Sequence, residues 1–244
     1  MGSRQDHRRR PRAAAGPWFQ RVTKRHRSAT GQPRLIEVDP ERIAMWVNGF
    51  AERHGALAWS STESSVGLSA ADGATALLEP FVPGAPARPG ALEDLAAWVV
   101  PPARLALILV RRGGYAVGLG QGAELIAHKV GTRYVQSRTA AGGWSQHRFA
   151  RRRDNQADAL VVSVIEHAQR VILATPSDAL VVGGDKALVR DVLSAARLAR
   201  TAGLPRRELF DLPDPKLVVL QQALRRGRAV RITLTELETS PVQS

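Results

Sequence analysis

The sequence predicts an α+β fold, with a mixed and mainly antiparallel sheet flanked by helices. Short apolar segments are separated by glycine-containing turns, which is the pattern of antiparallel strands. Longer segments repeat their apolar residues at helical spacing. Towards the carboxyl end, strand-like and helix-like segments follow one another, so the sheet is expected to be mixed.

The first helix is expected directly after Asp39. Asp39, Pro40 and Glu41 supply an N-cap, a proline at the first helical position and an acid in the first turn. Gly55 is expected to end the helix. Trp46 lies on the apolar stripe and is therefore expected to be a core residue rather than a surface that stacks on a ligand. The stripe consists of Ile43, Trp46, Val47 and Phe50.

Short strands follow this helix and then form an antiparallel meander. The prolines and glycines of 80–91 indicate a loop or a boundary between the two groups of strands. The first group is expected at 56–60, 65–70 and 74–79, with a hairpin turn at 71–73. The second group is expected at 105–110, 115–119 and 123–130, with glycine turns at 112–114 and 120–122.

A long helix is expected in the segment 149–168, whose apolar residues have helical spacing. Taken alone, Val161-Val162 and Val164-Ile165 could form a strand, but the length of the segment favours the helix. The remaining elements are expected as a strand at 180–182, a helix at 185–200 ended by Gly203, a helix from Asp214 to about Arg226, and a strand at 230–234.

The chain is expected to divide into a tail and one domain. Residues 1–34 are rich in arginine and contain a single acid, Asp6, so they predict a disordered basic tail. Such a tail could hold RNA phosphates without reading sequence, or it could have no function. Residues 35–238 are expected to form the domain, in which 35–100 is an extension of helix and strands and 102–238 is the core.

The composition favours a nucleic acid partner and excludes several kinds of site. The 244 residues include 35 Lys and Arg against 22 Asp and Glu, a formal net charge of +13. The absence of cysteine rules out disulfides, thiolate metal sites and cysteine nucleophiles. The six histidines lack a metal-ligand spacing, so no metal or other cofactor is expected.

Membrane insertion and secretion are not expected. No apolar run approaches the ~18 residues of a membrane-spanning helix. The arginine-rich amino terminus also lacks the apolar segment of a secretory signal. The sequence therefore predicts a cytoplasmic protein with no membrane partner.

The most informative segment lies between Arg138 and Arg153. The pair Gly142-Gly143 allows the backbone to approach a partner closely. Gln146 follows and offers a hydrogen-bond donor and an acceptor that do not titrate. The arginines that come next can neutralise phosphate groups. Together these residues predict a loop that enters RNA in order to position a water molecule.

This segment resembles the Gly-Gly-Gln loop of the eukaryotic and archaeal class-1 peptide-release factors, whose central domain reads roughly G-R-G-G-Q-S-x-x-R-F-A-R-x-R. A closer similarity is to the release-factor-like peptidyl-tRNA hydrolases of ribosome quality control. Their actinobacterial branch reads G-G-W-S-Q followed by R-F-A-R-R-R, which residues 142–146 and 148–153 satisfy. A gapless alignment with the class-1 factors puts Trp144 at the position of their glutamine. The resemblance therefore implies that Gln146 takes over that role two residues later.

The resemblance implies a fold, an activity and partners. In the release-factor central domain, which is RNase H-like, a strand meander leads into the loop, and a long basic helix, a strand, a helix and a final strand follow. The order predicted for 102–238 is the same, so 35–238 would be a release-factor-like catalytic domain. Its implied activity is hydrolysis of the peptidyl-tRNA ester on the ribosomal large subunit, which would release stalled nascent chains. The partners would be ribosomal RNA and peptidyl-tRNA, bound by a monomer without a cofactor.

The resemblance also implies a role for each residue of the segment. Gln146 would position the attacking water, and Gly142 and Gly143 would give the loop its bend. Ribosomal RNA and the tRNA would supply the rest of the catalytic groups. The RNA-binding residues would be Arg138, Trp144, Ser145, Arg148, Arg151, Arg152 and Arg153.

Two other functions are compatible with parts of this pattern. A non-catalytic protein that binds ribosomal RNA would have the same basic surface but would not need a glutamine after the glycine pair. A serine hydrolase would use Ser145 in a G-x-S-x-G elbow, but His147 replaces the last glycine of that motif. An elbow also requires a strand that leads straight into it, whereas 131–143 has an irregular pattern.

Overall fold

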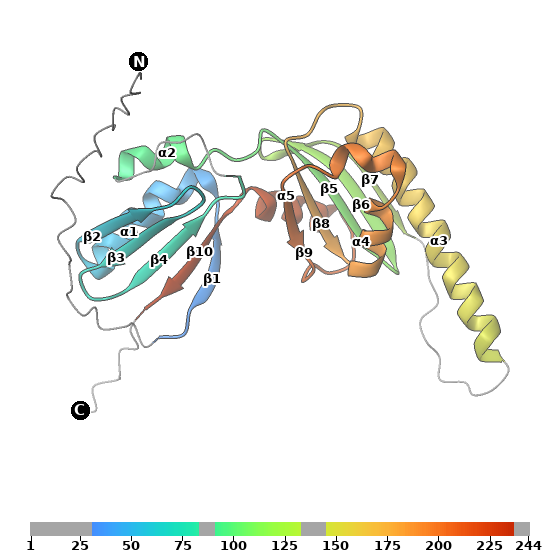
Figure 1. Cartoon of the computed structure of the whole chain (residues 1–244), viewed down its shortest axis with the longest axis horizontal. Coiled ribbons are helices and arrows are strands. Elements are labelled where there is room, and N and C mark those ends of the chain that lie inside the picture. Colours follow the sequence, from blue (N-terminus) through green and yellow to red (C-terminus); the bar gives the residue numbers. More distant parts are fainter. Residues whose placement is uncertain (1–30, 83–90, 133–144, 237–244) are drawn as a thin grey trace, which may run out of the picture.

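The computed structural model describes residues 31–82, 91–132 and 145–236, and for 145–155 it describes the backbone. It contains two five-stranded sheets, and the chain passes between them twice, after helix α2 (Leu95–Trp98) and after helix α5 (Leu217–Arg228) (Figure 1). One sheet is antiparallel and the other is mixed, and helices pack on both, so the predicted α+β class is confirmed. The RNase H-like arrangement stays a prediction. No helix in the described ranges is both long and apolar enough to span a membrane.

Sheet A is antiparallel throughout. Its order is β1 (Arg34–Val38), β10 (Val230–Thr235), β4 (Thr75–Glu79), β3 (Val66–Ala70) and β2 (Leu57–Ser61). Helices α1 (Ile43–His54) and α2 (Leu95–Trp98) cover one face, where Phe50 and Trp98 pack against the inward residues of β3, β4 and β10. Exposed and buried residues alternate along β4, which is the pattern of a strand with one face on a core and one in solvent.

Sheet B is mixed and lies between two layers of helices. Its order is β7 (Glu124–Thr132), β6 (Gly114–Gln121), β5 (Arg104–Arg111), β8 (Ala179–Gly184) and β9 (Arg206–Leu209). The strands β5 to β7 form the predicted meander, and β8 and β9 continue the sheet in parallel with β5. Helices α3 (Ser145–Ile172) and α4 (Lys186–Leu193) pack on one face and α5 on the other. Because both faces are covered, β5 is an almost continuous apolar run.

Most of the predicted elements are confirmed. The first helix ends at Gly55, whose φ is 88°. The 71–73 hairpin is present, with Gly73 at φ 98° and the Ala74 N–H donating to the Asp72 carboxylate at 2.9 Å. The long segment after the glycine pair is a helix rather than a strand. The Asp39 side chain makes no capping hydrogen bond, so its predicted role as N-cap holds for the backbone alone.

The predicted helix at 185–200 is wrong in its second half. Helix α4 ends early, and Ala195 has an extended ψ of 127° before a 3-10 helix, η3 (Ala196–Thr201), begins. The Ser194 hydroxyl donates to the carbonyl oxygen of Asp191 at 2.8 Å. Such a local bond competes with the next turn of the helix, and the break allows Leu198 to turn into the core.

The structure contains several short elements that were not predicted from the sequence. These are the edge strands β1 and β9, a 3-10 turn η1 (Pro40–Arg42) before α1, and the helical turns η2 (Leu92–Asp94) and α2. The last helix was also expected to start at Asp214, whereas α5 starts at Leu217. Asp214 forms an ion pair with Arg111 at 3.6 Å instead of capping the helix.

The final strand is present where the sequence predicts it, but it pairs in sheet A. Ile232 of β10 lies opposite Ile36 of β1 and Leu78 of β4. Residues of β10 alternate between buried and half-buried, which suits a sheet with a single covered face. The chain therefore crosses from sheet B to sheet A between α5 and β10.

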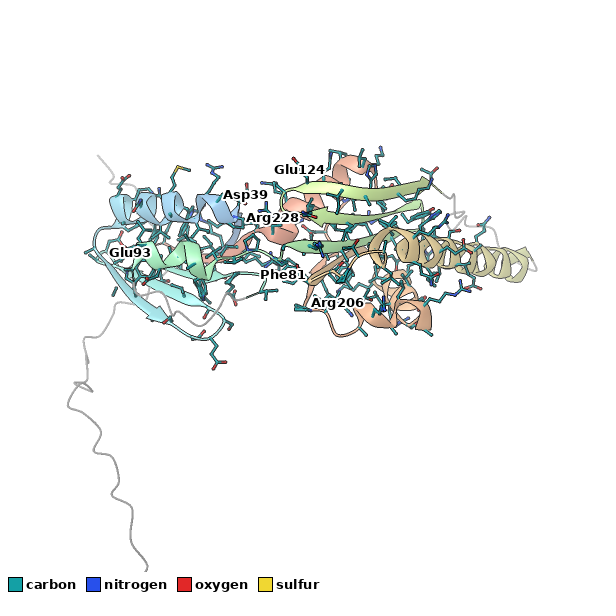
Figure 2. All side chains as sticks on the ribbon, turned by 90° about the horizontal axis from the view of Figure 1, so that it is seen from above. Asp39, Phe81, Glu93, Glu124, Arg206 and Arg228 are labelled. Atoms are coloured by element: carbon teal, nitrogen blue, oxygen red, sulfur yellow. The ribbon has the colours of Figure 1, made fainter. Side chains whose placement is uncertain are left out.

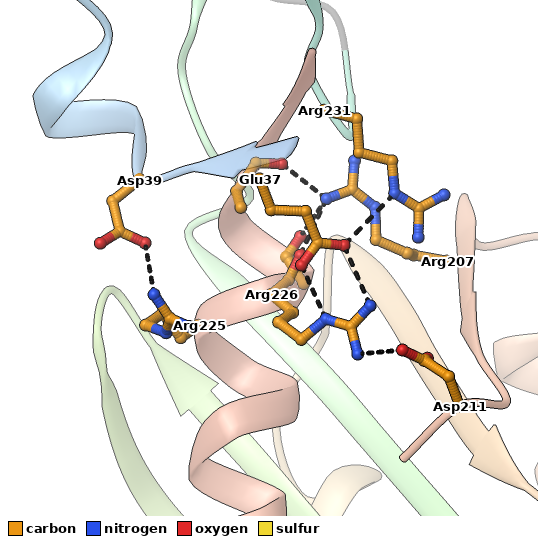
Figure 3. Close-up of polar contacts among 9 residues, drawn as sticks. Glu37, Asp39, Arg207, Asp211, Arg225, Arg226 and Arg231 are labelled. Atoms are coloured by element: carbon orange, nitrogen blue, oxygen red, sulfur yellow. Dashed lines mark hydrogen bonds and ion pairs between the residues drawn. The ribbon is translucent and has the colours of Figure 1, made fainter. Parts of the chain in front are cut away.

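Ion pairs hold this crossing in place (Figure 3). Glu37 of β1 accepts two hydrogen bonds from Arg226 of α5, from Nε at 2.7 Å and from Nη2 at 3.2 Å. Arg226 also donates to Asp211 at 2.8 Å, and its pKa is raised, chiefly by the bond to Glu37. Arg228 at the end of α5 donates to Glu41, which precedes α1, and Figure 2 shows it between the two halves of the molecule.

Arg207 of β9 is the most deeply placed charge at the crossing. Its Nη1 donates to the carbonyl oxygens of Arg226, Gly227 and Ala229, at 2.9, 3.4 and 2.6 Å. These are carbonyl groups at the end of α5, where a cation is favoured. The guanidinium lies over the ring of Phe81, 4.6 Å from its centroid. Burial lowers the pKa of Arg207 to about 10, so it stays charged at neutral pH.

Replacing Arg207 by methionine is expected to lower the free energy of unfolding by about 2–4 kcal/mol, because three buried carbonyl groups lose a charged donor. The methionine keeps the length of the side chain and its packing. Urea unfolding followed by circular dichroism measures the change. Arg206→Met, at the exposed neighbouring position, is the control and should stay within about 0.5 kcal/mol of the wild type. Equal effects of the two substitutions would contradict this role of Arg207.

Candidate functional site

The amino-terminal end of α3 contains the residues that the sequence singles out. Ser145 and Gln146 lie in the first turn of the helix, so Gln146 lies within the helix rather than in the loop before it. Arg148, Arg151, Arg152 and Arg153 lie within the first three turns. The other four predicted site residues, Arg138, Gly142, Gly143 and Trp144, lie outside the described residues.

The carboxyl-terminal half of α3 packs on sheet B and thereby holds the whole helix in position. Leu160, Val164, Ala168 and Ile172 follow one another every four residues and are fully or almost fully buried. In Figure 1 the helix extends from the sheet towards its amino-terminal end. Leu160 lies about 22 Å along the helix axis from Ser145, at 1.5 Å per residue. The site residues therefore lie at the amino-terminal end of α3, which extends beyond the part of the helix that packs on sheet B.

Strand β7 and helix α3, which precede and follow residues 133–144, both contact Tyr115 of the neighbouring strand β6. Tyr115 of β6 stacks on His167 of α3, with 5.5 Å between ring centroids and an interplanar angle of 18°. Gly131 of β7 lies against the same tyrosine, since a Cβ there would be 2.4 Å from its ring. The pKa of His167 is lowered, mainly by burial and further by Arg170 and Lys129. A neutral His167 at pH 7 suits this stacked position.

The start of α3 is positively charged in two ways. The first turn contains no acid, so no residue within it offers a carboxylate to the helix N–H groups or to the positive end of the helix dipole. The arginines add full charges to the same end. In α4, by contrast, Asp185 accepts from the N–H groups of Ala187 and Leu188. The start of α3 is therefore suited to an external anion such as a phosphate.

The groups at this end of α3 can bind phosphate and offer a neutral amide. Among the described residues, no three His, Asp or Glu side chains lie close enough together to hold a metal ion. Gln146 has a donor and an acceptor but cannot remove a proton as a general base.

A second surface feature lies beside sheet A and was not predicted from the sequence. Trp46 packs against the core of sheet A as expected, but it is only partly buried and also lines a hollow of about 450 Å³ between α1 and β1. Arg42 and Arg53 line the same hollow. The helical spacing of Arg42, Trp46 and Arg53 could have indicated this, because the three residues fall on one side of α1.

The region that holds α3 and sheet B matches a known family. A family model described as the Actinobacteria/chloroflexi VLRF1 release factor matches residues 103–233, which is more than half of the 244-residue chain. None of the curated proteins matches this chain.

Proposed function

The chain belongs to the Actinobacteria/chloroflexi VLRF1 release factor family, and from this premise we propose that it hydrolyses the ester between a nascent peptide and its tRNA on the ribosomal large subunit. Membership gives the chain a release-factor-like role in translation and implies an interaction with the ribosome. The finer proposal is that its substrate is a stalled nascent chain still attached to tRNA. Release of that chain would make it a factor of ribosome rescue.

Gln146 is the residue to which we assign the chemistry. The ester is already activated, so the main requirement is a water molecule aligned with its carbonyl carbon. Alignment of this kind contributes several kcal/mol, and roughly 7–11 kcal/mol in the best intramolecular reactions. The amide of Gln146, or its backbone N–H, would orient the water or donate to the developing oxyanion. The general base and acid would be supplied by ribosomal RNA and by the tRNA.

The neighbouring residues would place Gln146 in its RNA partner. Gly142 and Gly143 would bend the chain before α3, and Trp144 and Ser145 would contact bases. Ribosomal RNA phosphates would be bound by Arg138, Arg148, Arg151, Arg152 and Arg153.

The observation on which the proposal rests is the position of Gln146 at the positively charged start of a long, anchored helix within the matched region. An amide at the start of α3 can contact a partner that does not touch the sheet. The positive helix end and the arginines favour a partner that is a polyanion.

The proposal predicts that peptidyl-tRNA bound in large subunits is cleaved at least about tenfold faster than free peptidyl-tRNA, since it assigns the general base to the ribosome and not to this chain. Single-turnover release of labelled peptide from the two substrates measures the ratio. Equal rates would mean that the catalytic groups lie within the chain, with His147 and Asp154 as the first candidates. If the protein bound large subunits without releasing peptide, it would be a non-catalytic ribosome-binding protein.

A further inference from the structure

The hollow between α1 and β1, here called the α1–β1 groove, is separate from the start of α3. It has a volume of about 450 Å³ and is lined by both polar and apolar residues. Met45, which is 60% exposed, and Trp46 line it on the side of α1, and Ile36 and Val38 line it on the side of β1. The groove therefore presents an aromatic ring system and several apolar groups to a ligand.

Arginines line this groove and lack strong internal partners. Arg42 and Arg53 are exposed, and neither forms an ion pair with any residue in the described part of the chain. Arg225 has only a loose contact with Asp39, at 4.0 Å. The other nearby acid, Glu37, is bound in two places by Arg226. The groove thus has cationic groups available for an external anion.

Trp46 is held in one orientation. Its ring stacks on Phe50, one turn further along α1, with 5.4 Å between centroids and an interplanar angle of 8°. Phe50 is fully buried in the core of sheet A, so it fixes the indole from one side. A pre-oriented aromatic ring beside guanidinium groups is the combination with which proteins bind unpaired nucleotides.

We propose that the α1–β1 groove binds single-stranded RNA, with a base against Trp46 and phosphates on Arg42 and Arg53. Arg42, which directly precedes α1, and Arg53 near its end are 11 residues apart, about 16 Å at ~1.5 Å per residue, so they would hold different phosphates of one strand. An acidic peptide could pair with the arginines, but it would not use the fixed indole as a stacking surface. The RNA could be ribosomal RNA or tRNA, since both offer unpaired nucleotides. This inference concerns binding alone and does not depend on ester hydrolysis.

Charge reversal in the full-length protein tests the proposal. The double variant Arg42→Glu with Arg53→Glu should bind a single-stranded oligouridylate at least about tenfold more weakly, and the slope of log K against log salt should fall by about 1.4, or 0.7 for each phosphate contact. The control is Arg190→Glu with Arg197→Glu, which changes the net charge equally at exposed positions on α4 and η3. If the two double variants bound equally well, the groove would not be an RNA site.

A second measurement locates the contact and tests the stacking. An oligouridylate that contains 4-thiouridine should crosslink to the peptide around Trp46, and Trp46→Leu, which keeps an apolar side chain, should weaken binding about fivefold or more. Thermal unfolding of each variant shows whether it is folded. Crosslinks confined to other peptides, or displacement of the RNA by an equimolar acidic peptide, would overturn the proposal. Both measurements use RNA alone, so they give an answer whether or not the protein releases peptide from ribosomes.

The source of the RNA follows from direct ultraviolet crosslinking of the protein on large subunits. Bound with and without peptidyl-tRNA, the wild-type protein should crosslink through the groove either to ribosomal RNA in both samples or to tRNA in the second alone. Absence of any groove crosslink in both samples would contradict a role for the groove on the ribosome.

Discussion

Replacing Gln146 by alanine is expected to lower the rate of peptide release on large subunits by about 10²–10³-fold, the usual loss when one donor to the transition state is removed. The amide would act on the attacking water or on the oxyanion, so the loss should appear in the rate of the chemical step. Single-turnover release of labelled peptide at saturating protein measures that step directly.

Three measurements separate this effect from a loss of structure or of binding. Gln146 is in the first turn of α3, ahead of the buried residues that start at Leu160, so Gln146→Ala should leave the unfolding temperature and the affinity for large subunits unchanged. Gln222→Ala, at an exposed position on α5, is the matched control and should release peptide at the wild-type rate. Release at the wild-type rate by Gln146→Ala would refute the assignment, and Trp144 would be the next position to substitute.

The second large effect concerns the arginines of α3. Replacing Arg148, Arg151 and Arg153 together by alanine should weaken binding to large subunits and lower the slope of log K against log salt by about 2 to 3 units, because each lost phosphate contact accounts for about 0.7–0.9. Equilibrium binding to large subunits at several salt concentrations gives this slope. The salt slope should fall because each phosphate contact that is lost leaves counterions bound to the RNA instead of releasing them.

A matched triple variant shows whether the position of the arginines, and not only the net charge, affects binding to large subunits. Arg190, Arg197 and Arg200 are exposed on α4 and η3, and their replacement by alanine changes the net charge by the same amount. We expect this control to keep nearly the whole salt slope. Should the α3 variant keep the wild-type slope too, its arginines would be a solvated helix face and the ribosome would contact another surface.

Much of the candidate site could be predicted from the sequence because its residues are contiguous. Gln146 and the arginines lie within one short segment, and a motif of this kind can be recognised without knowing what packs against it. The first residue of α3, Ser145, was harder to predict from the sequence, since where a helix begins depends on contacts as well as on local preference. The α1–β1 groove was not predicted, because Trp46 has the spacing of a core residue. The partial exposure of Trp46 depends on where β1 lies.

The sequence by itself determined the local elements of this protein. Helical spacing and alternation are properties of segments of about 5 to 20 residues, so the meander of sheet B, the hairpin near Gly73, the first helix and α3 were all predicted. Pairing between distant segments was decided only by the tertiary structure. The short strand β1 becomes a strand by pairing with β10, whose Val230 lies opposite Val38, and this pairing moves the last strand from sheet B to sheet A. The same crossing buries Arg207, because the carbonyl groups at the end of α5 satisfy its charge only once β9 and α5 have come together.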